Sequence, residues 1–174
     1  MPTEELVEVV DLDDHTIGVR PLVECKQKGL LHRAVAVLLF DSAGRLLLQR
    51  RSTRKDWMAG YWDLSSTGHV KASELYQEAA VRELQEELGV ACRLRFVTKY
   101  LAPKFSAGDL TEWEYVSIFE GTYDGEVRAD GVEVEETKFV PPSTLVEMAS
   151  EPSPVLTPDA LATIKEFRRI SGRF

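Results

Sequence analysis

Apolar residues alternate or cluster along the chain in short runs that predict a sheet with helices placed between its strands. Strands are predicted over residues 6–10, 17–19, 34–40, 46–49, 63–66, 94–101, 113–119 and 137–140. The first two strands flank the polar stretch DLDDH and predict an N-terminal hairpin at about 5–20. The third and fourth flank DSAG, whose Asp and Gly are typical of tight turns, and they predict a second hairpin.

Helical periodicity is clearest in the segment that runs from about 73 to 88. This predicted helix ends at Gly89, because glycine is favoured just beyond the last turn of a helix. A second, short helix is predicted at 143–148. Helices interspersed among strands that arrive as hairpins predict an α/β fold with a mixed β-sheet.

The C-terminal part begins with a proline-rich linker at 151–158 and continues into a last helix at about 158–169. Thr157 suits the N-cap of that helix and Pro158 suits its first position. A chain of 174 residues fits one domain with a substantial core, so we expect 1–174 to form a single domain.

The composition, with 44% hydrophobic and 29% charged residues, is ordinary for a globular protein. No apolar run approaches the roughly 18 residues of a membrane helix, and MPTEELVEVV lacks the features of a signal peptide, so we expect a cytoplasmic protein without membrane association. In that compartment Cys25 and Cys92 are expected to be free thiols. The net charge of −8 argues against nucleic-acid binding, whereas a phosphorylated small molecule can be held through carboxylate-bound metal ions.

Three acids, Glu83, Glu86 and Glu87, fall within an arc of roughly 100° on the predicted helix. Like charges four residues apart destabilise a helix by about 0.2 to 0.5 kcal/mol, and the helix dipole disfavours acids near the C-terminal end. No lysine between residues 74 and 89 offsets them. A solvated acidic face is the ordinary explanation for such a triplet. A divalent cation, which takes several carboxylate oxygens from one side, removes all of these conflicts.

The spacing around the triplet favours the metal explanation. Gly68, Glu74 and the run RELQEELGV that begins at Arg82 reproduce the 23-residue box of the Nudix superfamily, and the chain resembles Nudix hydrolases. That resemblance implies an α/β/α sandwich with a mixed β-sheet. It also implies hydrolysis of a diphosphate-containing small molecule, such as a nucleoside diphosphate linked to another moiety, by water attack on phosphorus with Mg²⁺ or Mn²⁺.

The resemblance also implies roles for individual residues of the box. The metal ligands it implies are the main-chain carbonyl of Gly68 and the carboxylates of Glu83, Glu86 and Glu87. Arg82 and Glu74 are expected to orient those carboxylates. The general base that activates the water is Glu86, Glu114 or Glu135, and the box does not choose among them.

Outside the box, residues 29–119 are similar to type 1 isopentenyl-diphosphate isomerases, a Nudix branch that does not hydrolyse its substrate. This likeness implies that Arg51 and Lys55 grip the diphosphate. It also implies a second metal site, whose ligands are His32, His69, Glu112 and Glu114. Each histidine taken alone is better explained by ordinary packing.

Two positions depart from the isomerase pattern. Thr67 replaces the catalytic cysteine, and a threonine hydroxyl is a poor acid or base for moving a proton on carbon. Cys25 stands where a further histidine ligand is expected, and as a soft ligand it favours Zn²⁺ at the second site. The lost cysteine and the complete box both favour hydrolysis.

Three functions therefore compete: a metal-dependent hydrolase, an isopentenyl-diphosphate isomerase, and a non-catalytic sensor of a nucleotide or diphosphate. The complete box argues against the sensor. Specificity is expected in the loops at 52–62, 101–113 and 130–136. The tryptophans available to stack on a base, or simply to pack, are Trp57, Trp62 and Trp113. We expect a monomer or a homodimer.

Overall fold

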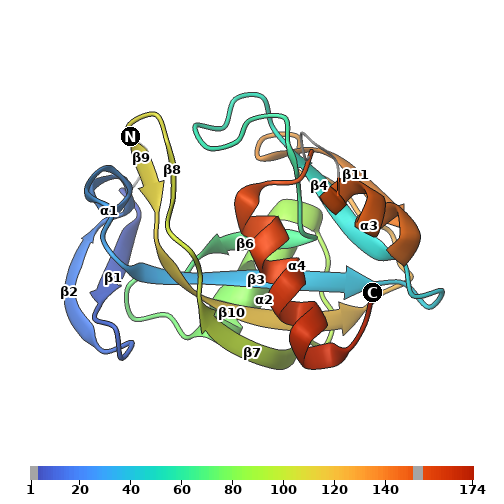
Figure 1. The fold of residues 1–174 in the computed structure, drawn as a ribbon, viewed down its shortest axis with the longest axis horizontal. Helices are drawn as coiled ribbons and strands as arrows, with labels where there is room; N and C mark the ends of the chain where they lie inside the picture. Colours follow the sequence, from blue (N-terminus) through green and yellow to red (C-terminus); the bar gives the residue numbers. More distant parts are fainter. Residues whose placement is uncertain (1–3, 151–154) are drawn as a thin grey trace.

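Figure 1 shows the computed structural model, which describes residues 4–150 and 155–174. The strands are β1 (Leu6–Val10), β2 (Thr16–Pro21), β3 (His32–Phe40), β4 (Leu46–Arg51), β5 (Trp62–Asp63), β6 (Ser66–His69), β7 (Arg95–Leu101), β8 (Phe105–Ala107), β9 (Leu110–Glu112), β10 (Glu114–Thr122) and β11 (Val134–Val140). The helices are α1 (Leu22–Lys28), α2 (Tyr76–Leu88), α3 (Pro142–Ser150) and α4 (Pro158–Ser171). The predicted linker lies partly outside the described residues.

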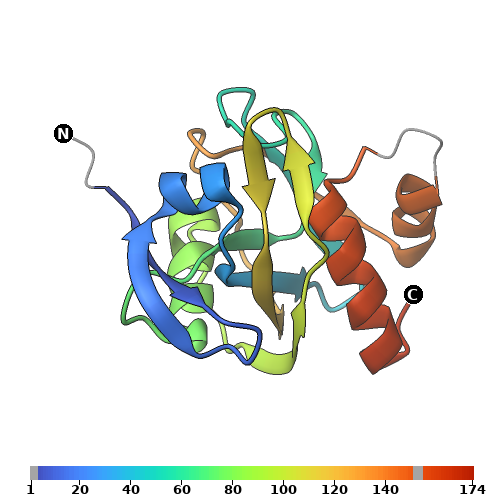
Figure 2. The same ribbon diagram turned by 60° about the vertical axis from the view of Figure 1, so that its left-hand side comes forward.

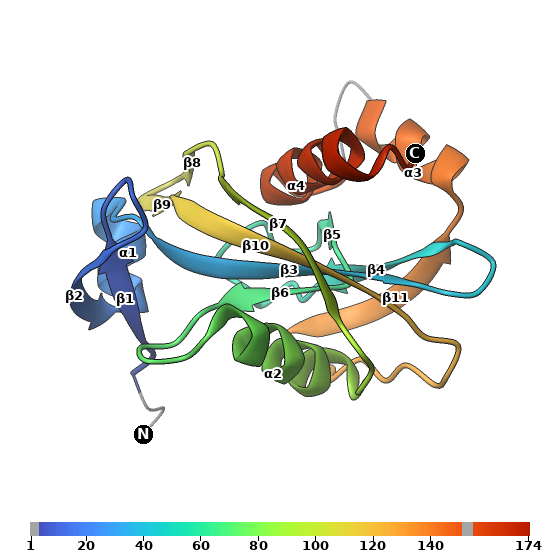
Figure 3. The same ribbon diagram turned by 90° about the horizontal axis from the view of Figure 1, so that it is seen from below.

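The main sheet is mixed and contains nine of the strands, while β8 and β9 pair with each other as a short hairpin (Figure 2). Helix α2 covers one face of the sheet and α4 covers the other (Figure 3). The predicted α/β fold with a mixed sheet between helical layers is confirmed. None of the helices within residues 4–150 and 155–174 is long and apolar enough to cross a membrane.

Strand β3 is the centre of both cores. Its even-numbered residues from Ala34 to Phe40 pack in the core that contains Ala160 and Phe167 of α4. Its odd-numbered residues from Val35 to Leu39 pack in the core that contains Leu84 of α2. The apolar run of this strand is continuous because a helix covers each face of the sheet, so neither set of side chains meets water.

The second predicted hairpin is present only at its turn. The Asp41 amide donates to the Arg45 carbonyl at 3.0 Å, and Phe40 opposite Leu46 is the one residue pair shared by β3 and β4. Beyond that point β3 pairs with β6 and β10, whereas β4 pairs with β5 and β11. Turn residues specify the reversal of the chain but not the later partners of the strands, so β3 and β4 separate beyond the turn.

Several predicted boundaries are correct and some are not. The N-terminal hairpin forms as predicted, with β1 and β2 antiparallel. Gly89 ends α2 in the left-handed conformation, and the hydroxyl of Thr157 accepts the Ala160 amide at the start of α4. Helix α2 begins at Tyr76 and not at 73, because Ser73 has a positive φ of 67° that a helix cannot include.

The sequence did not predict α1 or the β8–β9 hairpin, and it predicted a single strand at 63–66 where two short strands occur. Helix α1 is only seven residues long, and β8 and β9 have three residues each, so none carries a readable period. The predicted strand is divided into β5 and β6 because β5 pairs with β4, whereas β6 pairs with β3.

Candidate active site

A cavity of about 460 Å³ collects most of the residues singled out in the sequence. Its wall includes side chains from α1, the loop after β4, β6, α2, β9, β10 and the first turns of α4. The predicted site residues that line it are Arg51, Lys55, Gly68, His69, Arg82, Glu83, Glu86, Glu112 and Glu114. Thr67, at the position of the isomerase cysteine, lines it as well.

Gly68 packs directly against the carboxyl group of Glu83. A Cβ at Gly68 would lie 2.1 Å from Cδ of Glu83, a distance that no side chain tolerates. Glycine at this position therefore lets the main chain of β6 approach the acidic helix α2. The contact brings the two predicted metal-binding groups, the Gly68 main chain and the Glu83 carboxylate, next to each other.

Arg82 organises the acids around it. Its guanidinium donates to both carboxylate oxygens of Glu74, at 2.7 and 2.9 Å, and to the main-chain carbonyl of His69 at 3.0 Å. The same side chain donates to Glu83 at 2.6 Å and to Glu86 at 3.3 Å. The planar fork of arginine matches this bidentate geometry, so Arg82 and Glu74 hold the acidic helix against the loop that precedes it.

The three acids of the box have different surroundings. Glu83 and Glu87 are buried, whereas the Glu86 side chain is 57% exposed. Glu87 accepts from Nε2 of Gln49 at 3.0 Å and from the Thr67 amide at 3.3 Å. Burial and the neighbouring charge of Glu83 raise the pKa of Glu87 to about 8. Burial also raises the pKa of Glu83, although Arg82 opposes the shift.

The raised pKa values show that burial disfavours the ionised form of these acids. A bound cation stabilises that form through its positive charge. Oxygen donors converging from α2 and the Gly68 main chain fit a hard divalent ion such as Mg²⁺ or Mn²⁺. The residues present therefore fit the metal that the sequence predicted at this place.

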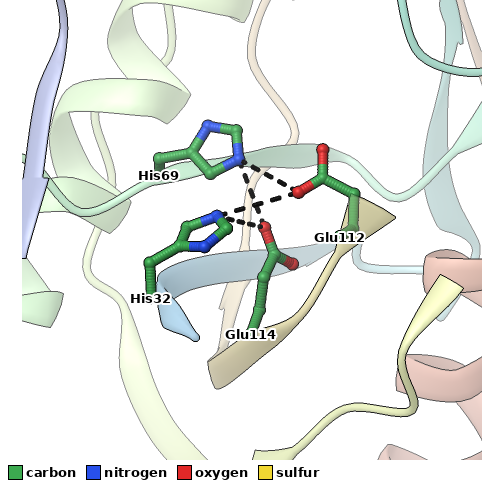
Figure 4. A group of neighbouring side chains, drawn as sticks. All are labelled: His32, His69, Glu112 and Glu114. Atoms are coloured by element: carbon green, nitrogen blue, oxygen red, sulfur yellow. Dashed lines mark ion pairs between the residues drawn. The ribbon is translucent and has the colours of Figure 1, made fainter. Parts of the chain in front are cut away.

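A second group, which we call the His–Glu cluster, consists of His32, His69, Glu112 and Glu114 (Figure 4). One ligand atom from each of these residues lies within 4.8 Å of all the others. Strand pairing explains the group, because parallel pairing places Glu114 opposite His32 and antiparallel pairing places His69 opposite Ala34. The Nε2 atom of His69 lies 3.2 Å from Glu114.

The orientation of His32 suits a ligand role. Its Nδ1 lies 2.8 Å from the Leu30 carbonyl and donates to it, which leaves Nε2 facing the two glutamates, 3.7 Å from Glu112 and 3.6 Å from Glu114. In the part of the chain that the structure describes, Nε2 of His32 and Oε2 of Glu112 are buried polar atoms without a hydrogen-bond partner. An outer hydrogen bond that fixes the ring while its other nitrogen faces the site is typical of metal-binding histidines.

The His–Glu cluster also contains its own positive charge. Burial opposes ionisation of His69, but hydrogen bonds to Glu112 and Glu114 raise its pKa to about 10. Burial likewise opposes ionisation of Glu114, but the two histidines hold its pKa well below the ordinary value. Lys26 of α1 adds a further cation, with Nζ 2.5 Å from Oε1 of Glu112.

Cys25 does not belong to this cluster. Its side chain is fully buried and packs with Val7 and Val9 of β1, on the side of α1 that faces the N-terminal hairpin. Burial raises the pKa of its thiol. The hypothesis of a soft sulfur ligand, and the preference for Zn²⁺ that followed from it, is therefore not supported by this geometry.

The predicted phosphate-binding cations line the cavity but already contact protein groups. Arg51 donates to the Trp57 carbonyl at 2.9 Å and to Asp63 at 3.1 Å. Lys55 lies 2.5 Å from Glu133 on the loop before β11. Glu135, one of the three candidate bases, is not among the cavity-lining residues, because its carboxylate accepts from Thr53.

The three tryptophans are separated by the fold. Trp57 is buried at the cavity wall, and its indole N–H donates to Asp159 at 2.9 Å. Trp62 packs against the core beside α4, and Trp113 lies under Lys104, whose Nζ is 3.8 Å from the ring centre. Of the three, Trp57 alone lines the cavity.

The charged cavity residues that the sequence analysis did not single out include Lys26, Asp63 and Asp159. Lys26 lies in a helix that the sequence did not predict, and Asp63 lies at an interrupted strand. Asp159 has the ordinary appearance of an acid in the first turn of a helix. No local pattern distinguishes these residues, because their proximity arises from elements that are far apart in the chain.

Comparison with known proteins gives two kinds of relative. A family profile described as NUDIX domain matches residues 30–160. The chain is 42% identical over 151 residues to an isopentenyl-diphosphate Delta-isomerase from Burkholderia multivorans, a match that covers 86% of each chain. It is also 34% identical over 161 residues to an uncharacterized Nudix hydrolase from Pseudomonas aeruginosa, covering 92% of each.

Among solved structures, a protein from Deinococcus radiodurans matches with a TM-score of 0.72 and 23% sequence identity. The match covers 95% of this chain and 99% of the other, and at this identity it shows a shared fold.

Proposed function

Because this chain belongs to the NUDIX domain family, we propose that it hydrolyses a diphosphate-containing small molecule with Mg²⁺ or Mn²⁺. The substrate is a nucleoside diphosphate linked to another moiety, or a related nucleotide, and water attacks phosphorus. The observation that carries the proposal is the box itself: Glu83, Glu86 and the Gly68 main chain lie at the wall of a cavity that also holds Arg51 and Lys55, and Glu87 is buried on the helix that carries the two acids.

The chain's own residues divide the work. Glu83, Glu86, Glu87 and the Gly68 carbonyl would hold the metal, which when bound neutralises the diphosphate and lowers the pKa of a water molecule. Arg82 fixes the carboxylates of Glu74 and Glu83 in place before any ligand arrives. Arg51 and Lys55 bind the phosphate oxygens as the substrate enters.

Glu86 is the best-supported general base of the three candidates. Its carboxylate lies at the cavity wall, is largely exposed, and contacts Arg82 at 3.3 Å. Glu114 is engaged by two histidines that lower its pKa, which makes it a weaker base. Glu135 is not among the cavity-lining residues.

The test is phosphate release, coupled to a phosphatase where needed. The panel comprises nucleoside diphosphates and triphosphates, nucleotide sugars, dinucleotides and isoprenyl diphosphates, each with Mg²⁺ and with Mn²⁺. We expect metal-dependent release from one class of substrate. Release from none of them under either metal would reject the hydrolase.

Isomerisation of isopentenyl diphosphate is the second candidate. The His–Glu cluster and the 42% identity to an enzyme of that name favour it, and Thr67 at the cavity wall argues against it. The same reaction mixtures decide, because an isomerase converts isopentenyl to dimethylallyl diphosphate without releasing phosphate. We expect no conversion by the natural chain, and measurable conversion would show that Thr67 does not prevent the reaction.

A further inference from the structure

Asp159 is a cavity residue to which neither the box nor the isomerase likeness assigns a role. It is the second residue of α4, after Pro158, and lines the cavity together with Trp57 and Thr163. An acid in the first turn of a helix is favoured by the helix dipole, which is its ordinary role. That role needs no contact with a cavity, whereas the carboxyl group of Asp159 lies against one.

The hydrogen bonds of Asp159 are incomplete. Oδ2 accepts the indole N–H of Trp57 at 2.9 Å, and among the residues that the structure describes Oδ1 has no hydrogen-bond partner. The neighbouring acid, Asp63, differs, because Arg51 and the Leu64 amide donate to its two oxygens at 3.1 and 2.8 Å. Asp159 is therefore the carboxyl in this part of the cavity that retains an unused acceptor.

The surroundings of Asp159 disfavour the ionised form of its carboxyl group. Burial raises the pKa of Asp159 to about 8, and the charges of Glu114 and Asp63 act in the same direction. Asp159 is half-buried, and within the described ranges its carboxylate form receives only the one hydrogen bond from Trp57. A ligand group that donates a hydrogen bond to Oδ1 favours that ionised form, whereas an apolar ligand group does not.

The shape of the cavity brings a ligand to this residue. A volume of about 460 Å³ is in the range that encloses a whole small molecule rather than a diphosphate alone. The wall also includes the apolar side chains of Ala34, Ala36 and Val116, which belong to the same core cluster as Ala160 of α4. The part of a substrate that extends beyond the diphosphate can lie along this wall and reach the first turn of α4.

We propose that Asp159 selects the substrate by accepting a hydrogen bond from a hydroxyl or amino group on the moiety linked to the diphosphate. The inference rests on the proposed diphosphate chemistry and names the substrate class within it: diphosphates of sugars or nucleosides, as opposed to isoprenyl diphosphates. A site that hydrogen-bonds a donor discriminates against an analogue that lacks it, because the acceptor in the occupied cavity is then left unpaired.

Binding measurements test the proposal directly. We would use the Glu86→Gln protein, to slow turnover, and titrate it by calorimetry in Mg²⁺ with ADP-ribose, UDP-glucose, isopentenyl diphosphate and inorganic pyrophosphate. In this parent at least one hydroxylated probe should bind more tightly than pyrophosphate. Adding Asp159→Leu should weaken the binding of that probe about tenfold, the effect of losing one hydrogen bond. Pyrophosphate should be unaffected, and isopentenyl diphosphate should bind equally or more tightly.

Two further variants keep the test sharp. Asp159→Asn keeps the size of the side chain and an oxygen for the Trp57 N–H, but it replaces the acceptor Oδ1 with an NH2 donor. It should therefore show the same selective loss of affinity even if the leucine variant folds poorly. Glu166→Gln is the matched control, because Glu166 lies on the same helix, pairs with Arg169 at 2.7 Å and does not line the cavity. It should leave all four affinities unchanged.

Equal weakening of all four probes by the asparagine variant, or no change in any, would overturn the proposal. A parent protein that prefers isopentenyl diphosphate to both hydroxylated probes, or that binds neither of them better than pyrophosphate, would overturn it as well. Failure of the hydrolase proposal is read separately in the protein that retains Glu86. Selective binding without phosphate release there would reject hydrolysis and leave the role of Asp159 in place.

Discussion

Two groups of glutamates lie at or beside one cavity, and their surroundings shift their pKa values in opposite directions. In the box, burial raises the pKa of Glu87 to about 8 and also raises the pKa of Glu83. In the His–Glu cluster burial acts in the same sense, but His69 and Lys26 lower the pKa of Glu112, and the two histidines lower that of Glu114, below the ordinary value.

The difference lies in the cations that each group receives from the chain. Of the box acids, Glu83 and Glu86 share the guanidinium of Arg82, which also serves Glu74, while the nearby charge of Lys55 acts on Glu87. The cluster acids meet His69, which is protonated at neutral pH, and Lys26. The box therefore depends on a cation from outside, whereas a metal entering the cluster has to displace a proton.

The largest effect should come from the box. Glu86→Gln should lower kcat about 100-fold or more, because it removes the proposed base and a metal-binding oxygen together. The control is Glu147→Gln, an exposed acid of α3 that does not line the cavity. Turnover assays on both variants should show loss in the first alone, and equal turnover would remove the box from the mechanism.

The next largest effect should appear in the free energy of unfolding, measured against pH in the presence of a metal chelator. The pKa of Glu87 is raised from 4.5 to about 8 in the folded chain, so between these values the folded chain binds more protons than the unfolded chain. Its contribution to stability is therefore present at low pH and is lost as the pH rises toward 8, by on the order of 2 to 4 kcal/mol. Glu87→Gln should flatten this slope in denaturant titrations. An unchanged slope would contradict the assignment.

The close approach of β6 and α2 should be a smaller source of stability. Gly68→Ala places a Cβ 2.1 Å from Cδ of Glu83, which should cost about 1 to 3 kcal/mol of unfolding free energy. Gly18→Ala is a control in β2, where the nearest atom to a new Cβ is a flexible guanidinium nitrogen at 3.8 Å. Denaturant unfolding that gives both variants equal stability would show that the loop moves away without cost.

The smallest effect on hydrolysis is expected from the His–Glu cluster. His32→Ala removes the Nε2 that faces the two glutamates and should leave turnover within about tenfold of the natural chain, while protein purified without chelator carries one fewer tightly held ion. Elemental analysis of the two proteins gives the ion content. Equal content would mean that the cluster is held together by its histidine–glutamate pairs alone.

Much of the fold follows from local patterns. The two-sided burial of β3 appears in the sequence as an unbroken apolar run, and Gly89 and Thr157 mark the ends of helices through their own backbone chemistry. The separation of β3 from β4 could not be predicted from local patterns, because β6 and β10 pair with β3 while β5 and β11 pair with β4. Tertiary pairing, rather than the turn, decided that outcome.

The candidate site divides in the same way. The box is readable because its acids lie on one helix, where spacing fixes direction. Glu114 and His32 are 82 residues apart and meet only because β10 runs parallel to β3, so their proximity was expected from resemblance and not from spacing. Asp159 had neither aid, since only the docking of α4 brings it to Trp57.

The position of β3 between two cores bears on how the molecule opens. Its side chains interlock with α2 on one face and α4 on the other, so neither helix can detach without exposing part of this strand. The two helical layers should consequently behave as one cooperative unit in hydrogen exchange. The amides of β3 should exchange only through global unfolding, at the slowest rate in the chain.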